Sequence, residues 1–364
     1  MRPLIDGHLD LAWNALGWNR DVALDLDDLN RSESGMTDHP ARGRATTTLP
    51  EMRAGGVGLC QATLLSRAKP VSLWETFAQG PPRANLDWSN REIAAAAALG
   101  QLAYYRQLER RGLLRPVRTR GELDDHWAAW SADPATTPVG FVLAMEGADP
   151  IVAPNRAEEW WDLGLRSASL VHYGEGPYAA GTGAEGPVTI EGFALLREFQ
   201  RLGMILDVTH LADEAFFQAM DAFQGPVLAS HNNCRALAPA QRQFSDEQIR
   251  LLIDRDAVIG VALDAWMLHP GWVRHRTSRE VVGLEAVVDH VDHICQLAGN
   301  GRHVAIGSDL DGGFGTEQTP AGLDRISDLR KLDGMLAARG YSEAAIDAVF
   351  HGNWLRFFRE HLPA

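Results

Sequence analysis

Seven side chains that can bind a divalent metal or move a proton stand at the ends of apolar segments. The segments are LIDGHLD (4–10), VGFVLAMEG (139–147), SASLVH (167–172), MILDVTH (204–210), PVLASH (226–231) and HVAIGSDLDG (303–312). The residues are His8, Asp10, Glu146, His172, His210, His231 and Asp309. Imidazole and carboxylate groups bind divalent metals, and a neighbouring carboxylate can transfer protons. The set predicts a centre with two adjacent metals and a hydrolytic water.

His8, Asp10 and Glu146 have the spacing and chemistry of a shared site. His8 and Asp10 lie two residues apart on a predicted strand, so both side chains project from one face and can converge on one cation. Glu146 has two carboxylate oxygens and can bridge two cations. Gly147 allows close backbone approach there. Taken alone, Glu146 is equally consistent with a helix-capping or salt-bridged residue.

His210 and His231 end consecutive predicted strands. A single histidine is more often structural than a ligand, but two at corresponding positions of neighbouring strands favour metal binding. Asp309 ends the last strand, which a closed barrel returns to the side of the first. There it can take a proton from a metal-bound water and pass it to a leaving amine.

Three other polar residues have simpler interpretations. Asp311 competes with Asp309 for the catalytic role, but lies two residues further into a loop and is expected to be structural. His290 and His293 belong to the helical segment DHVDH, with no further strand-end ligand nearby. We expect both histidines at the surface or behind the ligands.

Short apolar runs alternate with helical patterns along most of the chain, which is typical of repeated βα units. Eight strands are predicted, and their first residues are Leu4, Val57, Val139, Ser167, Met204, Pro226, Ala257 and His303. Predicted helices include 91–113, 189–203, 213–223, 245–255 and 280–299, with two more after the last strand. This pattern favours an α/β fold, a (β/α)8 TIM barrel with its active site at the carboxyl ends of the strands.

Three stretches interrupt the alternation: residues 20–48, 66–90 with Trp74 and Trp88, and the glycine-rich 173–188. Long loops in a compact domain are usually functional, so we expect active-site loops or lids. None has the composition of a linker. The sequence therefore predicts one domain over residues 1–364.

Composition excludes several classes of protein. The formal net charge is -14 and basic runs are absent, which argues against nucleic-acid and anionic-membrane partners. Cys60, Cys234 and Cys295 lack CxxC spacing, so reduced, buried thiols are expected. No signal peptide precedes the first strand and no apolar stretch is long enough to span a membrane. We therefore expect a cytoplasmic protein.

The ordered motifs resemble the membrane dipeptidase, or renal dipeptidase, family of the amidohydrolase superfamily. The resemblance runs from DGHLD through MRAGGVG, AMEG, SLVH, LDVTH, SHNNCRALAPAQRQF and GSDLDGG to GNWLR, nearly the whole chain. It implies a (β/α)8 metallo-dependent hydrolase with two zinc ions. His8 and Asp10 would bind the first metal and His210 and His231 the second, with Glu146 bridging.

The resemblance also implies roles for the remaining residues. His172 would polarise the scissile carbonyl and stabilise the oxyanion, and Asp309 would be the general acid/base. Arg242 would hold the substrate's C-terminal carboxylate; Arg235 ranks second for that role. The segments VHYGEGPYAAGTG and ALDAWMLHP depart from the family pattern. The second segment places Asp264 and Trp266 near the mouth of the barrel. Because of these departures, the resemblance does not determine the pockets for the substrate side chains.

The resulting expectation is a zinc metalloprotease: a dipeptidase acting on small peptides with a free C-terminal carboxylate, with L-Xaa-D-Xaa dipeptides as plausible substrates. The alternative is a related amidohydrolase acting on an N-acyl amino acid, a lactone or a modified peptide, because specificity lies in the loops. A noncatalytic metal protein is disfavoured because every catalytic residue is present. The sequence leaves the oligomeric state open, a homodimer included.

Overall fold

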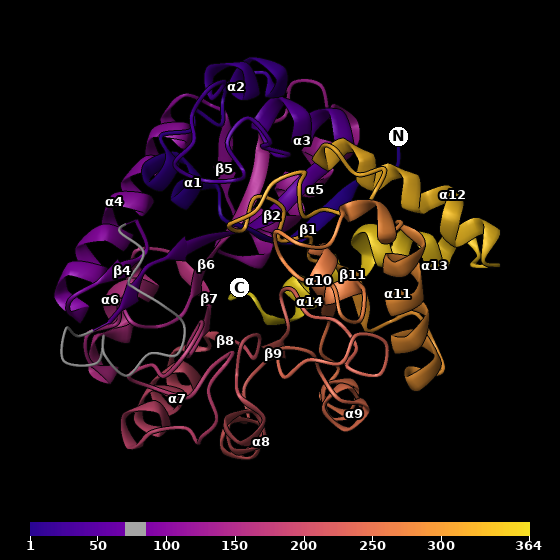
Figure 1. Cartoon of the computed structure of the whole chain (residues 1–364). Coiled ribbons are helices and arrows are strands. Elements are labelled where there is room, and N and C mark those ends of the chain that lie inside the picture. Colours follow the sequence, from indigo (N-terminus) through magenta and orange to yellow (C-terminus); the bar gives the residue numbers. More distant parts are fainter. Residues whose placement is uncertain (70–84) are drawn as a thin grey trace.

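The computed structural model of the protein describes residues 1–69 and 85–364. Within these residues, eight parallel strands follow the order predicted from the sequence and surround the centre of the molecule, with helices outside them (Figure 1). The strands are β1 (Leu4–Leu9), β2 (Val57–Leu65), β6 (Val139–Glu146), β7 (Leu165–Ser169), β8 (Ile205–Asp207), β9 (Val227–Leu228), β10 (Ile259–Val261) and β11 (Val304–Ile306).

Backbone and side-chain hydrogen bonds join neighbouring strands all the way around the barrel. Strands β1, β2, β6, β7, β8 and β9 pair in that order, and β10 pairs with β11. A parallel bridge between Ala229 and Ile259 joins β9 to β10. Between β11 and β1, the buried Asp6 carboxylate accepts hydrogen bonds from Ser308 N at 2.8 Å and Ser308 Oγ at 2.5 Å. The predicted (β/α)8 fold is confirmed, and Asp6 helps to close it.

Three further short strands accompany the eight barrel strands, and the last of the three pairs with β6. The five helices predicted between strands are all present. The strands are β3 (Arg67–Ala68), β4 (Asp87–Trp88) and β5 (Leu114–Pro116). The predicted helices are α4 (Arg91–Arg110), α7 (Ile190–Leu202), α8 (Asp213–Ala222), α9 (Asp246–Asp254) and α11 (Glu285–Ala298). Helices not named in advance are α1 (Leu11–Trp18), α2 (Leu26–Ser32), α3 (Leu49–Gly55), α5 (Arg120–Ala132), α6 (Ala157–Asp162) and α10 (Ala265–Leu268).

The C-terminal region differs slightly from the two helices predicted after the last strand. It holds α12 (Lys331–Ala338), α13 (Glu343–Asp347) and α14 (Asn353–His361). A π-helical turn over Ala348–Gly352 joins α13 directly to α14. The second predicted helix is therefore one long segment with a local change of winding.

Several helices begin where a short polar side chain accepts a hydrogen bond from the first turn. Asn90 caps α4 by accepting from Ile93 N at 2.8 Å, and Thr189 caps α7 by accepting from Gly192 N at 3.0 Å. Ser245 and Gln248 form a reciprocal capping box at the start of α9. Such caps satisfy amides that lack partners within the helix.

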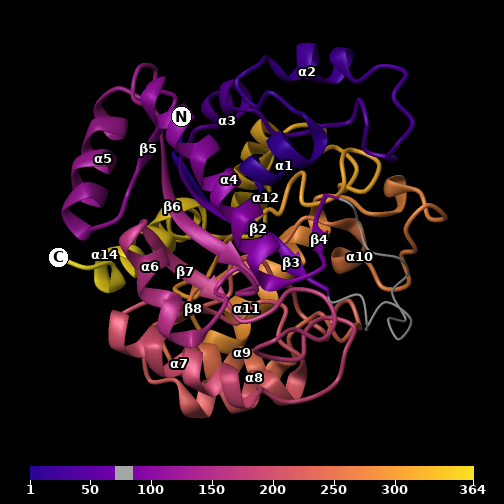
Figure 2. The same cartoon turned by 90° about the vertical axis from the view of Figure 1, so that its left-hand side faces the viewer.

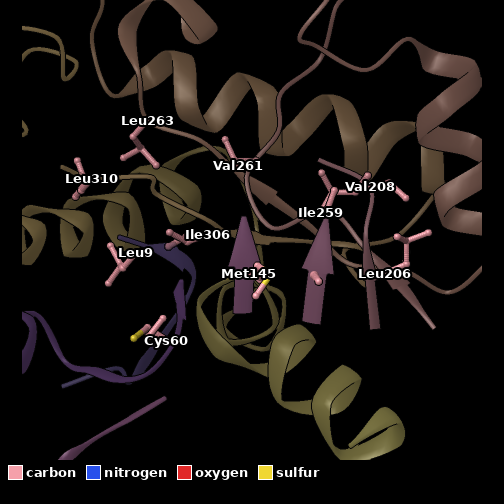
Figure 3. Packing of buried hydrophobic residues seen from close by; sticks show 14 of the residues in the cluster. Leu9, Cys60, Met145, Leu206, Val208, Ile259, Val261, Leu263, Ile306 and Leu310 are labelled. Carbon is pink, nitrogen blue, oxygen red and sulfur yellow. The ribbon is translucent and has the colours of Figure 1, made fainter. Parts of the chain in front are cut away.

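The barrel strands contribute to two apolar clusters because successive side chains point to opposite faces. The larger cluster packs strands against the outer helices, and Figure 3 shows part of it, including Met145, Leu206, Val261 and Ile306. The second cluster gathers strand residues such as Ile5 and Val142 around α14. The three cysteines are buried and form no disulfide, as predicted.

Candidate metal centre

All seven strand-end residues face one another at the carboxyl end of the barrel. Glu146 is the last residue of β6, and Asp10 directly follows β1. His172, His210, His231 and Asp309 each stand three residues beyond β7, β8, β9 and β11. Three groups drawn from the seven have ligand atoms close enough to hold a metal ion: His8 with Glu146 and His231, Glu146 with His172 and His210, and His8 with Asp10 and Asp309.

The two carboxylate oxygens of Glu146 face different histidines. Its Oε2 lies 3.7 Å from His8 Nε2. Its Oε1 lies 2.9 Å from His210 Nε2 and 3.4 Å from His231 Nε2. The two latter nitrogens are 3.1 Å apart. Each oxygen of the carboxylate therefore lies beside a different set of possible metal ligands.

Two buried atoms of the candidate metal ligands lack hydrogen-bond partners among the described residues. They are His8 Nε2 and Glu146 Oε2. An orphaned buried polar atom is costly, and a functional ion is one explanation for it. His8 Nε2 also lies 3.7 Å from Asp10 Oδ1 and 3.9 Å from Asp309 Oδ1, so three carboxylates surround one imidazole. The donor set therefore fits divalent cations.

The electrostatics of the carboxylates and of His210 and His231 agree with this fit, whereas Glu146 and Asp10 raise the pKa of His8 against the effect of burial. Burial raises the pKa of Asp309 well above its usual range, and Glu146 and Asp10 add to the effect because like charges repel. Burial also raises the pKa of Glu146. Burial lowers the pKa values of His210 and His231 well below the usual range. Both imidazoles are therefore neutral at pH 7, the form that binds metals.

The backbone at the centre includes residues in the left-handed region. His210 has φ 71° and Asp309 has φ 57°, and neither is glycine. Such conformations are uncommon for residues with a Cβ and cluster at functional sites. Gly147 has φ 85°, and a Cβ there would lie 3.3 Å from His172 N. The close approach predicted at Gly147 is therefore present.

Arg242 lies inside the site, whereas Arg235 lies outside it. The Arg242 side chain is buried, lines the cavity and donates from Nη2 to His231 O at 2.7 Å. Arg235 forms a bidentate ion pair with Asp213 at 2.7 and 2.8 Å, and is not part of the cavity wall. Of the two arginines, only Arg242 is therefore placed to contact a molecule in the cavity.

The mouth of the barrel holds a cavity of about 610 Å³. Asp264 and Trp266 line it, as expected from the sequence, and burial raises the pKa of Asp264 to about 6. Several other lining residues were not predicted from the sequence, and they include Trp13, Arg67, Tyr173 and Trp272. Arg67 and Tyr173 fall within predicted active-site loops, which was the available signal.

Those loops contribute to the site in different ways. In the loop 20–48, Thr46 donates from N and Oγ1 to the Asp311 carboxylate at 2.9 and 2.8 Å, so Asp311 holds this loop. In the loop 173–188, Thr182 Oγ1 lies 2.9 Å from His210 Nδ1. The described parts of the loop 66–90 include Arg67 and Asp87, while Trp74 lies outside the described residues.

The two histidines of α11 have different environments. His290 is fully buried, and its Nδ1 accepts a hydrogen bond from Cys234 N at 3.1 Å. The helix turns this residue inward to satisfy a buried loop amide. His293 is partly exposed and pairs with Asp246 at 2.8 Å. Neither residue belongs to the metal-binding groups among the described residues.

A (β/α)8 barrel with histidines and carboxylates at its strand ends defines a metal-dependent hydrolase. The family model for membrane dipeptidase, peptidase family M19, matches residues 1–362. The chain belongs to this family and is a metallo-dipeptidase.

Individual relatives agree. An uncharacterized dipeptidase of Schizosaccharomyces pombe is 26% identical, over 98% of this chain and 80% of its own length. Dipeptidase verJ of Clonostachys rogersoniana is 26% identical over 97% of this chain and 83% of its own.

Solved structures give the same result. The crystal structure of dipeptidase AC, a metallopeptidase of family M19, superposes with a TM-score of 0.78, 26% identity and coverage of 100% of this chain and 99% of the other. A metallopeptidase from Rhodobacter sphaeroides, liganded with a phosphinate mimic of L-Ala-D-Ala, superposes with a TM-score of 0.76. It has 25% sequence identity and the match covers 99% of both chains. Among the described helices of this protein, none has the length and apolarity needed to cross a bilayer.

Proposed function

We propose that this metallo-dipeptidase uses two zinc ions to hydrolyse dipeptides that carry a free C-terminal carboxylate. One observation carries the proposal: Glu146 presents one oxygen to His8 and the other to His210 and His231. His8 and Asp10 would hold one cation, His210 and His231 the other, and Glu146 both. When bound, the cations would supply Lewis acidity and would lower the pKa of a water molecule at the site.

The remaining residues would bind and orient the peptide. Arg242 would hold the C-terminal carboxylate through charge-assisted hydrogen bonds from its buried guanidinium. His172 would donate a hydrogen bond to the scissile carbonyl oxygen, where negative charge develops. Asp309, whose raised pKa suits proton transfer, would accept a proton from the attacking water and deliver it to the departing nitrogen.

The stereochemistry of the substrate is part of the proposal. The Rhodobacter sphaeroides relative binds a mimic of L-Ala-D-Ala, and it covers 99% of this chain. This supports L-Xaa-D-Xaa dipeptides as the substrate class. N-acyl amino acids remain the alternative class, because the same centre would hydrolyse their amide bond.

The test for the proposal compares substrates on the zinc-loaded enzyme. Elemental analysis should find two zinc ions per chain, and L-Ala-D-Ala should be hydrolysed much faster than N-acetyl-D-alanine. A faster reaction with the N-acyl compound would move the assignment to the amidohydrolase alternative. A single metal per fully active chain would refute the bridging role of Glu146.

Arg242 provides a sharper test of carboxylate recognition. Losing a buried charged partner costs about 2 to 5 kcal/mol, so Arg242→Met should lower kcat/KM for a free dipeptide by roughly 30-fold or more. The same variant should change little for the C-terminally amidated dipeptide, which the wild type should already hydrolyse poorly. Arg235→Met is the matched control and should affect neither substrate selectively. Equal losses on both substrates in Arg242→Met would mean that this residue only supports the fold.

A further inference from the structure

Three histidines of the centre have a hydroxyl group beside the ring nitrogen that faces away from Glu146. His8 Nδ1 lies 3.3 Å and His231 Nδ1 2.9 Å from the same Ser230 Oγ. His210 Nδ1 lies 2.9 Å from Thr182 Oγ1. A hydroxyl oxygen has two lone pairs and can accept from each ring. These imidazoles can therefore keep the proton on Nδ1 and offer the Nε2 lone pair to a metal, as metal-binding histidines do.

His172 has a different neighbour. Its Nδ1 lies 3.4 Å from Arg67 Nη1. A guanidinium is always charged, carries only donors and has no acceptor. In this contact Nδ1 must accept, so the proton of the neutral ring resides on Nε2. That atom lies 3.6 Å from Glu146 Oε1, and it therefore presents an N–H to the centre instead of a lone pair.

Arg67 is held firmly in the position that makes this contact. Its Nε donates to Asp87 Oδ1 at 2.6 Å, and its Nη2 lies 2.6 Å from the same oxygen. The backbone of β3 pairs in parallel with β4, which places Arg67 opposite Asp87. Both side chains are buried. Asp87, Arg67 and His172 thus form a connected row that ends at the metal centre.

Distance alone does not distinguish His172 from the candidate metal ligands. The ligand atoms of His172, Glu146 and His210 lie close enough together to hold one metal ion. We propose that Arg67 is a positioning residue that fixes His172 with its proton on Nε2, which keeps this ring out of the metal-ligand set and aims an N–H at the scissile carbonyl oxygen. The identity of the substrate carbonyl rests on the proposed dipeptidase function. The assignment of the His172 tautomer does not depend on that function. A metal at His172 Nε2 would require a proton on Nδ1, against the Arg67 guanidinium.

The direct test is ¹⁵N NMR of the zinc-loaded protein with ring-labelled histidine, using His172→Gln to identify the His172 signals. For His172 we expect a proton on Nε2 and none on Nδ1. For His8, His210 and His231 we expect a proton on Nδ1 and none on Nε2. A protonated Nδ1 on His172 in the wild type would overturn the proposal. This readout needs no substrate, so it stands apart from any failure of the proposed function, which the dipeptide assay reports separately.

Variants of Arg67 link the tautomer to the reaction. Arg67→Met should change the His172 ring signals and lower kcat by roughly 100-fold, the typical effect of losing an oxyanion donor. KM should stay within about threefold and the zinc content should stay unchanged. Arg67→Lys, which keeps a cation that can only donate, should recover part of kcat. Loss of zinc in Arg67→Met would instead show that this wall supports the metals, and would overturn the proposal.

Lys69→Met provides the charge-matched control. Lys69 lines the same cavity two residues from Arg67 and its Nζ lies 3.8 Å from Asp87 Oδ2, so its loss removes the same charge from the same wall. The variant keeps Arg67, whose Nη1 lies 3.4 Å from His172 Nδ1. We expect the His172 ring signals of Lys69→Met to match the wild type. The same spectral change in both variants would mean that the field of the wall, and not the Arg67 contact, sets the tautomer, and would contradict the proposal.

Discussion

The two ends of the barrel have opposite physical characters. The carboxyl end gathers buried carboxylates, three non-glycine residues in the left-handed region (His210, Asp309 and Asp311) and the orphaned atoms of His8 and Glu146. The amino end is apolar: α14 brings Trp354, Phe357 and Phe358 against residues of most strands. Figure 2 shows α14 on the opposite side of the barrel from β3, β4 and α10.

The contrast separates stability from chemistry within one fold. Each strained backbone position costs about 1 to 3 kcal/mol, and buried like charges add to that cost. Trp354 is fully buried, and its Nε1 donates to Ile306 O at 2.9 Å. Large buried aromatic side chains of this kind contribute several kcal/mol each. The amino end therefore offsets the cost of assembling a reactive site at the other.

The largest effect should come from Asp309→Asn at the carboxyl end. The amide keeps the shape of the side chain but cannot take a proton, so kcat should fall by roughly 10²- to 10⁴-fold. The free energy of unfolding and the zinc content should change little. Steady-state kinetics, elemental analysis and denaturant unfolding measure the three quantities.

Asp324→Asn is the matched control, since Asp324 is exposed and lies outside the metal centre. Its carboxylate pairs with Arg279 at a distance of 2.7 Å. It should keep the wild-type rate. A metal-replete Asp309→Asn enzyme with near-normal kcat would rule out Asp309 as the proton-transfer group.

Trp354→Ala should produce the reverse result at the amino end. Removing a buried tryptophan leaves a cavity and costs about 3 to 5 kcal/mol of the free energy of unfolding. The kcat of the folded enzyme, measured well below its unfolding temperature, should stay within about twofold. Trp161→Ala, on the half-buried surface of α6, should lose roughly half as much stability or less. A large loss of kcat in Trp354→Ala would mean that the two ends are coupled.

The smallest expected effect is on the pH dependence of the free energy of unfolding, and it comes from Asp149, a buried carboxylate beside the mouth of the barrel. Burial raises the pKa of Asp149 from 3.8 to about 6, although its Oδ1 accepts from Ala68 N at 2.9 Å. The folded state therefore binds this proton more tightly than the unfolded state, so stability falls as pH rises from about 4 to 6 and stays lower above that. The full effect is about 3 kcal/mol.

Asp149→Asn should remove this loss while keeping the acceptor for Ala68 N. The metal-free variant should be more stable than the metal-free wild type at pH 8, and the difference should shrink toward pH 4.5. Denaturant unfolding at both pH values measures it. A constant difference across this range would show that Asp149 is not protonated in the folded state.

Much of the fold could be predicted from alternation in the sequence. Buried parallel strands are continuous apolar runs, and segments such as VGFVLAMEG are recognisable without tertiary information. Boundaries moved by a residue or two, as at β7 and β10, because pairing with neighbours decides where a strand begins. The short helices α2, α3 and α6 escaped notice because their patterns are too brief to show a helical period.

The site was predictable to the extent that strand ends converge. His8, Glu146, His210 and His231 had to meet if the barrel closed. For His290 the sequence left open a position at the surface or behind the ligands, because the helical pattern does not reveal which buried amide a histidine will satisfy. Arg67 and Thr182 lie in loops, whose paths depend on packing and not on local periodicity.

The sequence by itself determined the barrel, the candidate metal-binding side chains and their order around the mouth, since these depend on apolar runs and on residue types at their ends. Only the tertiary structure decided what stands behind each imidazole: a hydroxyl at His8, His210 and His231, and a guanidinium at His172. Those neighbours come from loops and strands far away in the chain. A histidine's chemistry depends on which ring nitrogen carries the proton, and that proton responds to contacts in space, which residue spacing does not encode.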